Sequence, residues 1–152
     1  MPEQETIERA REDEREGKSP STQAGEFVRE EMEHIREGKH GARSTKQAIA
    51  IGLSKARQAG VNLPPPRKGR VSSRTKKQAA RDMSKGRSRK RRKPSATRSR
   101  AVKRALKREP RSAASRRALS RQARSAARSR SKSARSRAAK KAAPTRKRNR
   151  RR

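Results

Sequence analysis

Apolar residues recur at helical spacing in one part of the chain, between residues 20 and 60. The first run follows Ser19 and Pro20, a pair typical of a helix start because proline fits the first helical position. Its members fall three or four residues apart, with one aromatic beside them: Ala24, Val28, Met32, Ile35 and Phe27. Gly38 can end the helix in a left-handed conformation. This pattern predicts a helix that begins at Pro20 and ends at about Gly38.

A second helical run follows the loop GKHGARS. Ser44 and Gln47 fit a capping box, in which the two residues satisfy backbone amides reciprocally. Ile49, Leu53 and Ala56 share one face with Ile51 nearby, and three consecutive prolines at 64–66 forbid continuation of the helix beyond Gly60. A second stripe of small residues recurs every four positions and would permit close approach of the helices: Ala48, Gly52 and Ala56.

The two runs together predict a short antiparallel helical hairpin over residues 19–60. Its candidate core is Ala24, Phe27, Val28, Met32, Ile35, Ile49, Ile51 and Leu53. The first helix is acidic and the second is basic, so their facing surfaces are complementary. The core is small for an independent unit, which leaves open a homodimer that shares it.

The rest of the chain has weaker patterning. Residues 1–18 are highly charged, and because only Ile7 and Ala10 are apolar, we expect a frayed helix or coil without an anchor. Residues 61–71 are a proline-rich linker, and residues 72–152 are a low-complexity tail of Arg, Lys, Ser and Ala.

Within the tail, short helices are expected. One begins near Thr75 and runs to about Met83. A weak 13-residue repeat over 98–110, 111–123 and 124–136 predicts short cationic helices, with Pro110 and Pro144 as breaks.

Composition then decides the expected fold class. Of 152 residues, 26% are apolar and one is aromatic, against nearly half apolar in ordinary domains. So little apolar surface does not offset an ordering entropy of about 1–2 kcal/mol per residue. The chain is therefore predicted to be mostly disordered with α-helical segments: a short helical hairpin plus a basic tail.

Charge is distributed unevenly along the chain. Residues 1–40 hold 12 acids and 7 bases, residues 41–66 hold 4 bases and no acids, and residues 67–152 hold 38 bases and 2 acids. The net charge of +35 far exceeds the magnitude of about 2–8 that solubility requires. Basic side chains that neutralise phosphates release counterions, so this tail predicts binding to nucleic acid through the backbone.

The residues expected to contact phosphate lie in the dense cationic block and the repeats. They are Arg87, Arg89, Lys90, Arg91, Arg92, Lys93, Arg98, Arg100, Lys103, Arg104, Lys107, Arg108, Arg116, Arg117, Arg121, Arg124, Arg128 and Arg130. The tail has no aromatic residue on which bases could stack, which favours duplex DNA over single strands, with RNA as the second candidate.

Other chemistry finds little support in the sequence. The chain has no cysteine, no glycine-rich phosphate loop and no serine near a base in a foldable segment, so no catalysis and no cofactor are expected. His34 and His40 with Glu33 and Glu37 match no zinc pattern, and we expect them to be exposed side chains rather than metal ligands. The tail lacks the apolar face that an interfacial membrane helix needs.

The segment KHGARSTKQAIAIGLSKARQAGVNLPPP (39–66) resembles a motif of a family of small basic bacterial proteins of unknown function. Residues 99–129 also resemble the tails of that family. The motif has the form KHG-x-(S/T)-KQAIAIGLSKAR-x-AG, and some members are labelled DNA-binding or plasmid-stabilisation proteins. The tail composition is similar to that of linker-histone and bacterial histone-like tails, although Arg dominates here.

These observations lead to one expectation with two alternatives. We expect a bacterial, cytoplasmic, nucleoid-associated protein that binds DNA without sequence specificity, and the acidic start without a signal-peptide pattern fits that compartment. The first alternative is an RNA- or ribosome-associated assembly protein. The second is a plasmid-maintenance component whose hairpin contacts a specific protein.

Overall fold

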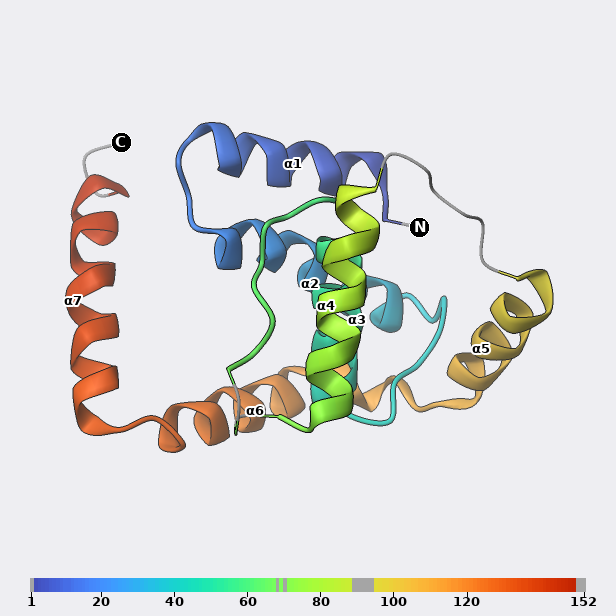
Figure 1. Cartoon of the computed structure of the whole chain (residues 1–152). Coiled ribbons are helices and arrows are strands. Elements are labelled where there is room, and N and C mark those ends of the chain that lie inside the picture. Colours follow the sequence, from blue (N-terminus) through green and yellow to red (C-terminus); the bar gives the residue numbers. More distant parts are fainter. Residues whose placement is uncertain (1, 68, 70, 89–94, 150–152) are drawn as a thin grey trace. The chain divides into compact units, whose positions relative to one another are not determined.

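The computed structural model describes residues 2–67, 69, 71–88 and 95–149, in two compact units, Met1–Ser115 and Arg116–Arg152. The described residues form helices and no strand (Figure 1). The first unit holds α1 (Gln4–Arg15), α2 (Pro20–Arg36), α3 (Thr45–Gln58), α4 (Ser73–Arg87), α5 (Ala96–Arg108) and the 3-10 helix η1 (Arg111–Ala114). The second unit holds α6 (Arg116–Arg128) and α7 (Lys132–Asn149).

The prediction of a mostly disordered chain is wrong, because the described residues are largely ordered in helices. The prediction counted apolar surface as the one source of order. It neglected the high helix propensity of Ala, Arg, Lys and Gln, which make up most of the tail. It also missed how closely small residues allow helices to pack. In α5 and α6 no residue is buried, so local propensity rather than a core supports these two helices.

The two helices predicted between residues 20 and 60 are present as α2 and α3, and they pack on each other. Gly52 of α3 is the point of closest approach: a side chain there would lie 2.7 Å from Cα of Val28 in α2. Ala48 and Ala56, one turn to either side of Gly52, are fully buried. The small stripe of α3 therefore faces α2, as its spacing suggested.

The core differs from the predicted set in its α3 half. Ala24, Phe27, Met32 and Ile35 of α2 are buried, whereas Val28 is half-buried. Ile49, Ile51 and Leu53 of α3 are also only half-buried, because the stripe of small residues occupies the interface with α2. Of the predicted α3 face, Ala56 lies in the buried cluster and Leu53 packs against it, whereas Ile49 and Ile51 are not part of it.

Helix α1 is anchored to the core, so the prediction of a frayed helix or coil without an anchor is wrong. Ala10 joins Ala24, Phe27 and Ala56 in the buried cluster, and Ile7 packs against that cluster. Arg9 adds ion pairs to Glu5 and to Glu26 of α2. Two apolar residues are sufficient here because they meet a phenylalanine that is already fixed by α2 and α3.

Helix α4 packs along α3 (Figure 1). A buried carboxylate of α4 lies between the two helices. Asp82 is 1% exposed and accepts hydrogen bonds from Ser54 (2.7 Å), Gln58 (2.9 Å) and Gln78 (3.0 Å). At the end of α4, a side chain on Gly86 would meet the carbonyl oxygen of Arg57 at 2.0 Å. One of the two acids in the tail therefore has a structural role.

The segment that ends α5 returns to the loop between α2 and α3. Leu106 and Pro110 accept backbone hydrogen bonds from Gly41 (2.9 Å) and Ala42 (3.1 Å). A side chain at Gly41 would lie 1.8 Å from the carbonyl oxygen of Glu109, so only glycine fits there.

The 3-10 helix η1 continues this contact. The Thr45 hydroxyl donates to the carbonyl of Ala113 at 2.7 Å, and the Arg36 Nε donates to that of Ala114 at 3.0 Å. Both alanines are buried. The end of the first tail repeat and the start of the second thus belong to the folded unit.

Several helix caps and helix ends differ from those predicted. The Ser44 hydroxyl accepts from the Gln47 amide as expected, but the Gln47 side chain accepts from Arg43 rather than Ser44. Helix α4 is capped by Ser72 and so begins before Thr75. Pro144 lies inside α7 and does not break it.

We predict that Gly52→Ala lowers the free energy of unfolding by about 1–3 kcal/mol, because its methyl group would force α2 and α3 apart. The matched control is Gly25→Ala in α2, where nothing lies within 4 Å of the added carbon. That variant should be more stable by about 0.5–1 kcal/mol, since alanine replaces glycine inside a helix. Urea unfolding followed by circular dichroism measures both, and equal effects would refute the close approach.

Candidate nucleic-acid interface

Every described residue of the predicted phosphate-binding set has an exposed side chain. These residues are Arg87, Arg98, Arg100, Lys103, Arg104, Lys107, Arg108, Arg116, Arg117, Arg121, Arg124, Arg128 and Arg130. The other five, Arg89, Lys90, Arg91, Arg92 and Lys93, lie outside the described residues. Arg87 also donates a hydrogen bond to the Asn62 side chain at 3.2 Å.

Helix α5 gathers its basic residues on one side. Residues 100, 103, 104, 107 and 108 are all Arg or Lys, and successive turns of a helix place these positions on one face. Val102 lies across the helix from that face and is 52% exposed. The result is a cationic strip about 12 Å long at 1.5 Å per residue.

Helix α6 carries a narrower and more regular strip. Arg117, Arg121, Arg124 and Arg128 are spaced by four, three and four residues, which aligns them along the helix axis. Leu119 and Ala126 lie on the opposite side and are half-buried. We call these four arginines the α6 arginine stripe.

Helix α4 has a comparable stripe that sequence reasoning missed. Arg74, Lys77, Arg81 and Lys85 are exposed and recur at three- and four-residue spacing, and the face toward α3 carries Ala79 and Asp82. The signal was present as basic residues at helical spacing. It was overlooked because the predicted helix began too late. The phosphate-binding residues were assigned instead to the denser cationic block after Lys85.

Most acidic residues of the first unit form ion pairs with basic residues of the same unit. All ion pairs between described residues lie within residues 3–55. Hydrogen bonds to Asp13 and then Glu16 raise the pKa of Lys18 to about 12. Hydrogen bonds from His34 and Lys39 lower the pKa of Glu3. Nine of the 14 acids thus have a basic partner in α1–α3 or in the turns between these helices.

The two histidines do not behave as expected from the sequence. Their side chains are 13% and 18% exposed, for His34 and His40 respectively, rather than exposed. The carboxylate that faces them is Glu31, which is buried, and not Glu33 or Glu37. Because Glu31 and His34 are three residues apart on α2, they share the face that the loop covers.

The arrangement as a whole supports electrostatic binding. Three cationic strips project from helices whose own acids are few, and no strip includes an aromatic side chain. Among the described residues, no helix is both long and apolar enough to cross a membrane.

Comparison with known proteins adds a family resemblance for one part of the chain. The search of curated proteins and the search of solved structures returned no significant match. The family match carries no DNA-binding or plasmid label. Residues 17–68, which include α2, α3 and the segment that follows them, match a family of unknown function (DUF6496).

Proposed function

We propose that the protein binds duplex DNA without sequence preference, as a nucleoid-associated protein of the bacterial cytoplasm. Binding rather than catalysis is its activity. The observation that carries the proposal is the separation of charge: the acids pair within residues 3–55, while the strips of α4, α5 and α6 are exposed.

The physical basis is phosphate neutralisation. A duplex carries one negative charge per about 1.7 Å of its axis together with condensed counterions. A stripe of four arginines over about 16 Å of helix can neutralise several of these charges at once. Residues 116–152 contribute 17 basic residues and no acids to the total.

Two features favour a duplex bound without base readout. Single-strand and loop recognition relies on aromatic stacking, and the one aromatic residue, Phe27, is buried in the core. Base readout requires side chains held in fixed geometry. Helices α5 and α6 bury no residue, so no core holds their side chains at a fixed depth.

We predict a steep dependence of affinity on salt and little dependence on sequence. If about ten charges engage, log affinity should fall against log salt with a slope near −9, at about −0.9 per phosphate. Fluorescence anisotropy with two duplexes of equal length and unrelated sequence measures both quantities. A shallow slope, or a preference beyond about a hundredfold (about 3 kcal/mol), would contradict the proposal. If structured RNA competes more strongly than duplex DNA, the protein is an RNA-binding protein instead.

We also predict that the α6 arginine stripe contributes directly to the affinity for DNA. Replacing Arg117, Arg121, Arg124 and Arg128 by Gln keeps helix propensity and should reduce the magnitude of the salt slope by about 3.6, the loss of four phosphate contacts. The control removes four exposed bases from the first unit: Arg11, Arg15, Arg43 and Lys46, each replaced by Gln. Both variants lose the same net charge, so equal slopes in the two variants would show that total charge alone matters.

A further inference from the structure

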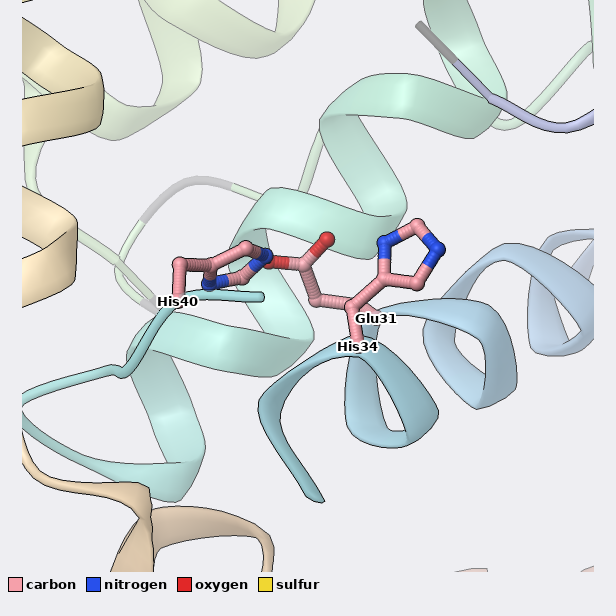
Figure 2. Close-up of side chains that lie close together, drawn as sticks. All are labelled: Glu31, His34 and His40. Carbon is pink, nitrogen blue, oxygen red and sulfur yellow. The ribbon is translucent and has the colours of Figure 1, made fainter. Parts of the chain in front are cut away.

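The end of α2 and the loop after it bring two imidazoles and one carboxylate together. Glu31, His34 and His40 each offer one ligand atom, and these atoms all lie within 4.8 Å of one another. Figure 2 shows the Glu31 carboxylate between the two rings, with one nitrogen of each ring on its side. The rings meet edge to face with their centroids 6.2 Å apart.

The buried carboxylate is incompletely satisfied. Glu31 is 0% exposed, and neither of its oxygens accepts a hydrogen bond from a described residue. Lys55 Nζ lies 2.7 Å from Oε2 and His40 Nε2 lies 3.4 Å from Oε1, but both are charge contacts without hydrogen-bond geometry. A buried carboxylate is costly unless a cation or donors compensate it, so this site favours an additional positive charge.

Each imidazole is oriented by an acceptor on its outer side. His40 Nδ1 lies 3.1 Å from the Gly41 carbonyl oxygen, which can only accept, and the other ring nitrogen, Nε2, faces Glu31. His34 Nε2 lies 2.8 Å from a carboxylate oxygen of Glu3, which leaves Nδ1 for the inner side. Metal-bound histidines usually make this kind of outer hydrogen bond.

Charge in the cluster is also unbalanced. Lys39 and Lys55 pair with Glu3, Glu30, Glu31 and Glu37, so four carboxylates meet two ammonium groups when both imidazoles are neutral. Lys55 also donates to Glu30 Oε1 at 3.2 Å. Lys55 can therefore stay paired with Glu30 while another cation occupies its place beside Glu31.

We propose that Glu31, His34 and His40 bind a divalent transition-metal ion of the zinc type. Two imidazoles and one carboxylate are a donor set that Zn²⁺ accepts with three protein ligands and one further position for water. Mg²⁺ and Ca²⁺ prefer oxygen ligands and are not expected to bind.

The site would fasten the loop between α2 and α3. His40 precedes Gly41 and Ala42. Their amides donate hydrogen bonds to the carbonyl oxygens of Leu106, near the end of α5, and Pro110, which follows it. An ion that fixes His40 to α2 therefore also stabilises the surface on which residues 106–114 dock. Because an ion bound only to the folded state stabilises it by mass action, the melting temperature should rise with Zn²⁺ concentration.

The test is titration of the full-length protein with ZnCl₂, followed by calorimetry and by NMR of the imidazole signals. The chain has two histidines and no cysteine, so few other strong zinc ligands compete. We expect one ion per chain and saturable shifts of both imidazoles together, reversed by a chelator, with no response to Mg²⁺. His34→Ala and His40→Ala should each weaken binding at least about tenfold.

Glu33→Gln is the matched control, because Glu33 lies on the same helix, is 45% exposed and pairs with Arg29 outside the cluster. It should bind Zn²⁺ as the unaltered chain does. If the histidine variants fail to fold, the NMR titration of the unaltered protein decides by itself. Shifts of neither imidazole or of one alone, or undiminished binding by a folded His34→Ala/His40→Ala variant, would overturn the proposal.

Discussion

The close approach of α3 to α2 at Gly52 sets the position of nearly everything else in the first unit. Because no side chain separates Gly52 from the backbone of Val28, Ala56 reaches the Phe27 cluster on one side of the contact. The same spacing brings Lys55 within reach of Glu30 and Glu31. A larger residue at this point would separate both the apolar cluster and the ion pairs. Helix α1, which depends on Phe27 for its anchor, would lose its support as well.

Burial in this chain depends on short side chains more than on large ones. Eight of the eleven buried hydrophobic residues in the part of the chain that the structure describes are alanines, found at positions such as Ala24, Ala48 and Ala114. Alanine contributes little area by itself, but it loses no side-chain entropy and lets backbones pack closely. This explains how a chain with 26% apolar residues forms an ordered unit. Polar groups complete the packing, as Asp82 does between α3 and α4 with three hydrogen bonds.

Charge is arranged so that the folded unit neutralises its own acids. Asp13, Glu26, Glu30 and Glu31 are each paired with a lysine or arginine from α1–α3 or the turn between α1 and α2. The basic strips of α4 and α5 are thus displayed by a unit in which most acidic residues already have a basic partner. Long-range attraction to phosphate follows from the excess of +35 over the whole chain. The loop that holds His40 is also the loop on which residues 106–110 of the basic tail dock, through Gly41 and Ala42.

Local rules determined helices α2 and α3 and the basic character of the tail. Ser19, Pro20 and Ser44 indicated where α2 and α3 begin, Gly38 and Gly60 adopt positive φ near their ends, and the exposed bases follow from composition. Each of these features depends on residues a few positions apart. Tertiary structure decided which face of α3 is buried, that Ile7 and Ala10 anchor α1, and that residues 106–114 return to the α2–α3 loop. It also decided that His34 and His40 meet Glu31, because that contact requires the Gly38 turn to fold the loop back on α2. Contacts between distant segments have no signature in local spacing, and for that reason the sequence by itself left them undetermined.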